Sequence, residues 1–108
     1  IRCIKGEIWD VAIDIRRSSP SYLQWVCETL SEFNKKMFYI PVGFAHGFLT
    51  LSNVAEITYK TTAEYHPDCE KGIRWDDPQI AIDWPEMDIY LSDRDLQLPF
   101  LKNAEVFE

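Results

Sequence analysis

The sequence predicts a single all-β domain, built as a sandwich or a barrel. Several short segments alternate apolar and polar residues, which is the period-2 pattern of a strand with one buried face. Glycine, proline, serine and asparagine separate these segments at regular intervals, and almost none of the chain has a helical pattern. We find no internal repeat, linker or low-complexity segment, so residues 1–108 are expected to form one unit.

Length and charge limit the classes of protein to which the chain can belong. Its 108 residues can bury a core but leave room for only one domain. The net charge of −7 argues against general binding to nucleic acid or to acidic membranes, although a few cations in a cleft would suffice for an anionic ligand. No apolar run approaches a membrane span and no segment resembles a signal peptide, so we expect a cytoplasmic protein.

The three cysteines, Cys3, Cys27 and Cys69, are an odd number and lack CxxC spacing. Neither a disulfide framework nor a zinc site is indicated, and we expect buried, reduced thiols.

The N-terminal part of the chain reads as a β-hairpin. Residues 1–5 and 7–16 are its expected arms, with the turn around Gly6. Trp9, Val11, Ile13 and Ile15 alternate with Asp10, Ala12 and Asp14, as in a half-buried strand. Residue 1 already lies in strand-like sequence, so we expect the chain to begin inside a domain. The segments that follow are a loop (18–21), a strand (22–30) and a polar turn (31–36).

A turn at residues 41–43 organises the middle of the chain. Residues 38–49 read as a strand, a tight turn and a second strand. Pro41 cannot donate a ladder hydrogen bond and Gly43 can adopt a positive φ, so this pair breaks the strand and redirects it. The second strand carries His46.

Fewer elements are expected in the C-terminal half. Residues 55–62 read as a strand with Ala55, Ile57, Tyr59 and Thr61 on one face, and residues 80–84 read as a shorter one. Ser92 is expected to cap a helical turn over residues 93–97. Residues 98–108 read as a surface extension.

The residue types alone leave the role of each candidate residue open. His46 is either a packing residue or, because Gly43 and Gly47 leave space beside it, a ligand contact. Tyr59 should be buried or line a cavity, either as a core tyrosine or as a proton donor to a carbanion. Without HxH or HxxxH spacing, we expect no metal site. Arg94 and Asp95 read first as a solvated helix start, with a phosphate contact and a histidine-orienting carboxylate as the alternatives. Further candidates are Glu70, in a charged loop that reads as solvated, His66, in a polar loop, and Tyr65, a weaker case of the same kind as Tyr59.

A series of motifs, in one order along the chain, resembles a known family. Pro41-x-Gly43-x-x-His46-Gly47-Phe48 is similar to the second motif of the cupin barrels. The longer set is Glu7-x-x-Asp10-Val11-Ala12-x-Asp14-x-Arg16, Ser19-Pro20, Ile40-Pro41-x-Gly43-Phe44-Ala45-His46-Gly47-Phe48, Tyr59-Lys60, Gly72-Ile73-Arg74-Trp75-Asp76-Asp77-Pro78, Ile82-Asp83-Trp84-Pro85 and Leu91-Ser92-x-x-Asp95. Together they resemble the dTDP-4-dehydrorhamnose 3,5-epimerases, cupins of the rhamnose pathway.

The resemblance implies a jelly-roll barrel without metal or cofactor, acting as a homodimer on a dTDP-linked 4-keto-6-deoxy sugar. The reaction would be epimerisation at C3 and C5 of dTDP-4-dehydro-6-deoxy-glucose to dTDP-4-dehydro-rhamnose. By the same resemblance, Tyr59 matches the acid and Asp95 the carboxylate of a histidine–aspartate dyad. His46, Glu70 and Arg94 match substrate contacts, and Tyr65 matches a second tyrosine near the sugar.

The chain departs from the family pattern at two functional positions. The family's base histidine, in an Arg-Gly-Leu-His segment, and its lysine, in a Gly-Lys segment, both fall upstream of the match to Ile1. The resemblance therefore implies the C-terminal part of an epimerase, lacking N-terminal strands, inactive alone and in need of a dimer or swapped contact to cover its edge. The alternatives are a non-catalytic nucleotide-sugar-binding module and a related cupin ketoisomerase.

Overall fold

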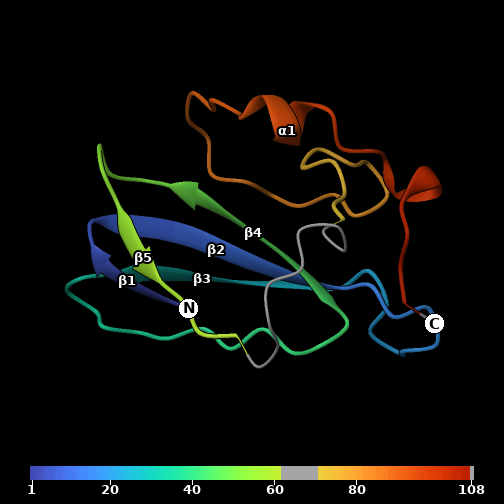
Figure 1. The fold of residues 1–108 in the computed structure, drawn as a ribbon, viewed down its shortest axis with the longest axis horizontal. Coiled ribbons are helices and arrows are strands. Elements are labelled where there is room, and N and C mark those ends of the chain that lie inside the picture. The colour runs from blue at the N-terminus through green and yellow to red at the C-terminus, as the bar shows by residue number, and fades with distance from the viewer. Residues whose placement is uncertain (62–70, 108) are drawn as a thin grey trace.

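The computed structural model describes residues 1–61 and 71–107, and two antiparallel sheets form its framework (Figure 1). One sheet has the strand order β3-β2-β4, and the other pairs β1 with β5. The strands are β1 (Arg2–Lys5), β2 (Glu7–Asp14), β3 (Trp25–Ser31), β4 (Phe44–Thr50) and β5 (Glu56–Thr58). Helical structure in the described ranges is limited to α1 (Asp93–Leu96) and a single 3-10 turn, η2 (Leu101–Asn103). The all-β prediction is confirmed.

The predicted hairpin at the N-terminus is wrong. β1 pairs with β5, whereas β2 pairs with β3 and β4, so the chain changes sheets at Gly6. Gly6 has a φ of +80°, and its N–H donates to Glu32 Oε2 at 2.6 Å. A side chain at this position would collide with the carbonyl oxygen of Val54, which leaves glycine as the residue that allows the crossing.

β2 is the central strand, and both of its faces are buried. One face packs under the C-terminal segment (residues 71–107), where Val11 and Ile13 join Ile80 and Leu101 in a core cluster. The other face carries Asp10, at 0% exposure, together with Ala12 and Asp14. The expectation of a half-buried strand is therefore wrong, because β2 has neighbours on both edges and its second face turns toward β1 and β5.

A second, smaller cluster joins the two sheets. Ile8 of β2 and Leu30 of β3 pack against Cys3 of β1, with Ile57 of β5 beside them. Cys3 is thus buried as expected, but Cys27, in β3, is exposed, so the expectation of a buried thiol is wrong there. Cys69 lies outside the described residues.

The turn predicted at residues 41–43 is present, although the strand expected before it is not. Gly43 has a φ of +90°, the Phe44 N–H donates to the Pro41 carbonyl at 3.3 Å, and β4 begins at Phe44. Before the turn, the chain makes one isolated bridge, from Met37 to Arg2. The strand predicted for residues 55–62 is also shorter, since β5 ends at Thr58 opposite Arg2.

The C-terminal segment lies across the sheet formed by β3, β2 and β4 instead of extending into solvent (Figure 1). Leu101 is buried, and its N–H donates to Asp77 Oδ2 at 2.6 Å. Phe107 N–H donates to the Ile15 carbonyl at 3.0 Å, so the predicted surface extension is wrong. The short strand predicted for residues 80–84 is also absent: the side chain of Ile80 enters the core, and Ala81 has a φ of 54°.

The predicted helical turn is confirmed at α1. Ser92 is its N-cap, and the Ser92 hydroxyl accepts a hydrogen bond from the Asp95 N–H at 3.1 Å. None of the described helices has the length and apolar character required to cross a membrane.

Candidate functional site

His46 and Asp10 form a pair on the face of the three-stranded sheet that turns toward β1 and β5. In the register of β2 with β4, His46 lies opposite Ala12 and Asp10 lies opposite Phe48. The two side chains are therefore diagonal neighbours on one face, within reach of each other. His46 Nε2 lies 2.6 Å from Asp10 Oδ1.

This pair buries a carboxylate with few partners. The Asp10 side chain has no exposure, whereas the His46 side chain is 27% exposed. The 2.6 Å contact lacks hydrogen-bond alignment, and within the described residues neither Asp10 oxygen has a hydrogen-bond partner. Because a buried carboxylate without partners is costly, His46, at 2.6 Å, is the group placed to offset the burial of Asp10.

A cavity of about 640 Å³ brings His46 and Tyr59 together. Its wall also includes Phe44, Phe48 and Lys60. Tyr59 lies just beyond the end of β5 and is 71% exposed, so of the two placements expected for it, a cavity wall is the one observed. A mainly apolar cavity with a few polar groups is typical of a small-molecule site.

Arg94 and Asp95 lie in a second groove, which is larger than the His46 cavity and about as open to solvent; we call it the open groove. This groove, of about 1500 Å³, runs along β4 and the C-terminal segment, and its lining also includes His46 and Lys71. Asp95 is exposed, and across residues 1–61 and 71–107 it makes no contact with a histidine. Of the predicted histidine–aspartate dyad, the described residues therefore contain the carboxylate of Asp95 without its histidine. Tyr65, His66 and Glu70 lie outside the described residues.

A metal site is not formed by the described part of the chain. No three histidine, cysteine, aspartate or glutamate side chains in that part gather closely enough to hold an ion. What the arrangement offers chemically is a histidine and a phenol at one cavity, with a buried carboxylate against the histidine.

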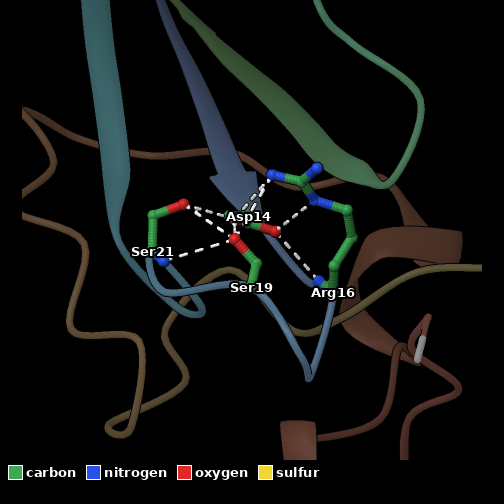
Figure 2. Close-up of polar contacts among 4 residues, drawn as sticks. All are labelled: Asp14, Arg16, Ser19 and Ser21. Atoms are coloured by element: carbon green, nitrogen blue, oxygen red, sulfur yellow. Dashed lines mark hydrogen bonds and ion pairs between the residues drawn. The ribbon is translucent and has the colours of Figure 1, made fainter.

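Asp14, at the end of β2, is the most heavily hydrogen-bonded carboxylate near the site (Figure 2). Arg16 donates to it from Nε and Nη2, each at 3.0 Å, and from its backbone N–H. The hydroxyls of Ser19 and Ser21 donate to Oδ2. The hydrogen bonds from Arg16, with those from the two serines, hold the pKa of Asp14 far below its usual value, although burial acts in the opposite direction.

Asp14→Asn should lower the free energy of unfolding by an amount that depends on pH. Because the pKa of Asp14 is lower in the folded chain, its stabilisation is complete above about pH 4, the usual carboxyl pKa, and declines as the pH falls below it. Urea unfolding at pH 7, 4 and 3 measures this, and the difference between wild type and variant should shrink toward low pH. Asp76→Asn, in an exposed pair with Arg74, is the control and should change little at any pH. A constant Asp14→Asn difference from pH 7 to 3 would contradict the assignment.

Asp10 is the site residue that sequence reasoning missed. It was assigned to the polar face of a half-buried strand, where an aspartate needs no explanation. Asp10 and Ala12 are two residues apart and therefore lie on the same face of β2. This places Asp10 near His46 only once β2 and β4 are known to be antiparallel neighbours in the observed register. Arg16 belongs to one of the motifs that carry the family resemblance, but the sequence assigns it no role.

The antiparallel sheets, with a histidine–carboxylate pair on one face, belong to a jelly roll of the cupin type, the fold of the solved structures that this chain resembles. A sequence profile described as dTDP-4-dehydrorhamnose 3,5-epimerase matches residues 1–103. The chain belongs to the dTDP-4-dehydrorhamnose 3,5-epimerase family.

Individual relatives agree with the profile. The dTDP-4-dehydrorhamnose 3,5-epimerase of Methanothermobacter thermautotrophicus is 47% identical over 110 residues, and that of Pseudomonas aeruginosa is 48% identical over 108 residues. A crystal structure of dTDP-6-deoxy-D-glucose-3,5-epimerase from Legionella pneumophila, in complex with dTDP-4-keto-L-rhamnose, matches with a TM-score of 0.91 and 48% identity. That match covers 94% of this chain and 55% of the Legionella chain.

The chain is shorter than these relatives. Each of the two curated relatives aligns with 99% of this chain, but the aligned part is 60% of the relative's own length.

Proposed function

We propose that this chain is part of an enzyme that epimerises dTDP-4-dehydro-6-deoxy-glucose at C3 and C5, giving dTDP-4-dehydro-rhamnose. The observation that carries the proposal is the cavity shared by His46 and Tyr59, in a chain of this family, with the buried Asp10 carboxylate 2.6 Å from His46 Nε2. The Legionella relative was solved with dTDP-4-keto-L-rhamnose, which supports a dTDP-linked sugar as the ligand.

The reaction follows from the acidity of the sugar. The protons at C3 and C5 flank the C4 ketone, so a base can remove either of them to form an enolate. Return of the proton from the opposite face inverts that carbon. Tyr59 is the proposed donor, because its phenol lies at the cavity wall without being buried. His46, which lies against Asp10, is the proposed contact to the sugar.

The nucleotide part of the substrate is anionic, although the chain carries a net charge of −7. Arg94, Lys71 and Arg74 line the open groove and supply local positive charge. Arg94 is the proposed contact to the pyrophosphate, since a guanidinium suits paired phosphate oxygens. Glu70 and Tyr65 are proposed as further substrate contacts, and the enzyme is proposed to work as a homodimer.

These 108 residues are proposed to be inactive by themselves. Asp95 is the proposed carboxylate of the catalytic dyad, yet it has no histidine partner in the described part of the chain. The base histidine and the lysine would come from the part of the relatives' length that this chain does not span. The same observation favours the second candidate, a nucleotide-sugar-binding module without catalysis.

A hybrid protein separates the two candidates. In it, the N-terminal segment that the family resemblance implies, taken from the Pseudomonas aeruginosa relative, precedes Ile1 of this chain. Both proteins are incubated in D₂O with dTDP-4-dehydro-6-deoxy-glucose, and deuterium at C3 and C5 is followed by NMR. The enzyme proposal expects deuterium at both carbons with the hybrid and none with the 108-residue chain.

Each other outcome has a defined meaning. A folded hybrid that binds the sugar nucleotide without exchange would overturn the enzyme proposal and favour the binding module. Exchange by the 108-residue chain alone would overturn the proposed inactivity. Movement of the carbonyl away from C4 would identify a ketoisomerase.

A further inference from the structure

Besides its hydrogen bonds to Asp14, the Arg16 side chain contacts a second group of residues. Arg16 uses Nε and Nη2 on Asp14, and its side chain remains 42% exposed. Its aliphatic part and the face of its guanidinium are turned toward the turn at residues 41–43 and the start of β4. Figure 2 shows Arg16 and the two serines approaching Asp14 from different sides, with β4 passing near the guanidinium.

Arg16 occupies the space that a side chain at Gly43 would need. A β-carbon built on Gly43 would lie 2.6 Å from both Cγ and Cδ of Arg16. Gly43 also has a φ of +90°, which few other residues adopt without strain. The Ile15 N–H donates to the Gly43 carbonyl at 3.1 Å, so side chain and backbone hold the turn from the same segment.

The guanidinium also covers Phe44. Arg16 Cζ lies 5.2 Å from the centroid of the Phe44 ring, within the range of a cation–π contact. Phe44 lies opposite Asp14 in the register of β2 with β4, and His46 follows two residues later on the same face. Arg16 thus ties the end of β2 to the beginning of the strand that carries His46.

Both residues that Arg16 holds belong to the wall of the 640 Å³ cavity. Gly43 and Phe44 line this cavity with His46 and Tyr59, whereas Asp14 and Arg16 are not part of its lining. Any displacement of the turn would therefore change the shape of the cavity next to His46 without removing a group that faces it.

We propose that Arg16 is a positioning residue, which Asp14 holds in one rotamer so that its side chain sets the Gly43 turn and the Phe44 ring as a wall of the His46 cavity. The importance of this wall for a sugar nucleotide rests on the proposed function, but the positioning itself does not. Arg16 acts only through Gly43 and Phe44.

The chain contains a matched control. Arg74 repeats the same two interactions elsewhere, because its Nε donates to Asp76 at 2.7 Å and its Cζ lies 5.3 Å from the Phe100 ring centroid. Neither Asp76 nor Phe100 lines the His46 cavity. Arg74→Met therefore removes an ion pair and a cation–π contact of the same kind, whose partners do not line the His46 cavity.

The test uses NMR on the 108-residue chain, with thermal unfolding recorded in parallel. The chain has only two histidines, so the His46 ring signals are assigned with a His66→Ala variant. Arg16→Met and Asp14→Asn are both expected to shift the signals of Gly43, Phe44 and His46, while the methyl signals of Ile8 and Leu30 stay in place. Arg16→Lys keeps the charge but loses the paired hydrogen bonds, and should restore these signals only in part.

Arg74→Met should leave the Gly43, Phe44 and His46 signals unchanged. A lower melting temperature in Arg16→Met with unchanged Phe44 and His46 signals would show that Arg16 only stabilises the fold, and would overturn the proposal. Shifts of equal size in Arg16→Met and Arg74→Met would do the same. None of these signals depends on epimerase activity, so failure of the proposed reaction would be seen separately in the deuterium experiment.

Discussion

Replacing Tyr59 with phenylalanine should lower turnover by the hybrid protein roughly 100- to 10,000-fold, the usual range for loss of a positioned acid or base. Phenylalanine retains the ring at the cavity wall but removes the hydroxyl that would return the proton to the sugar. Because Tyr59 is 71% exposed, loss of its hydroxyl should cost little stability. The measurement is the rate of epimerisation at saturating substrate, with KM determined in the same series.

The control for this variant is Tyr22→Phe, which removes a phenol that lines neither the His46 cavity nor the open groove. Its turnover should equal that of the parent hybrid. If Tyr59→Phe changes KM while kcat stays the same, Tyr59 is a substrate contact and the donor must be another residue. Inversion at C3 and at C5 should fall by the same factor with Tyr59→Phe if one donor serves both carbons.

Leu101→Ala should lower the free energy of unfolding by about 2–5 kcal/mol, the range for truncating a buried leucine. Leu101 is buried beside Val11, Ile13 and Ile80, and alanine would leave a cavity under β2. Val11 and Ile13 belong to β2, which is paired on both edges, so they cannot easily move to fill the space. Urea unfolding, with the midpoint and slope both fitted, measures the loss.

Leu96→Ala provides the matched control, because Leu96 in α1 is 48% exposed. Its effect should stay within about 0.5 kcal/mol, as for most surface substitutions. Equal losses for the two variants would mean that the C-terminal segment does not pack against the sheet in solution. The outcome bears on the site, because the same segment carries Arg94 and Asp95 to the open groove.

The elements predicted correctly are those whose causes are local. The alternation around Val11 identifies β2 because side chains of a strand alternate within a few residues. The turn at Gly43 and the cap at Ser92 depend on backbone and side-chain properties of single residues. His46 and Tyr59 were identified as candidates in the same way, from their residue types and positions in strand-like segments.

The elements predicted incorrectly depend on partners far along the chain. The alternation of apolar and polar residues and the turn residues do not say which strands pair. The sequence therefore predicts a hairpin of β1 with β2, although the partner of β1 is β5. Residues 98–107 resemble a surface extension in the sequence because Leu101, the one buried side chain among them, lies between exposed neighbours. The attachment of these residues comes from Asp77, whose carboxylate accepts the Leu101 N–H.

The sequence alone determined the all-β class, the turn that leads into β4 and the presence of His46 and Tyr59 beside strands, because residue type and short-range periodicity govern all of these. Only the tertiary structure decided that Asp10 is buried against His46 and that Tyr59 reaches the same cavity. It also decided that Arg16 turns from Asp14 toward Gly43. The physical reason is that a β-sheet brings together residues of strands far apart in the chain, and a local pattern does not say which strands become neighbours.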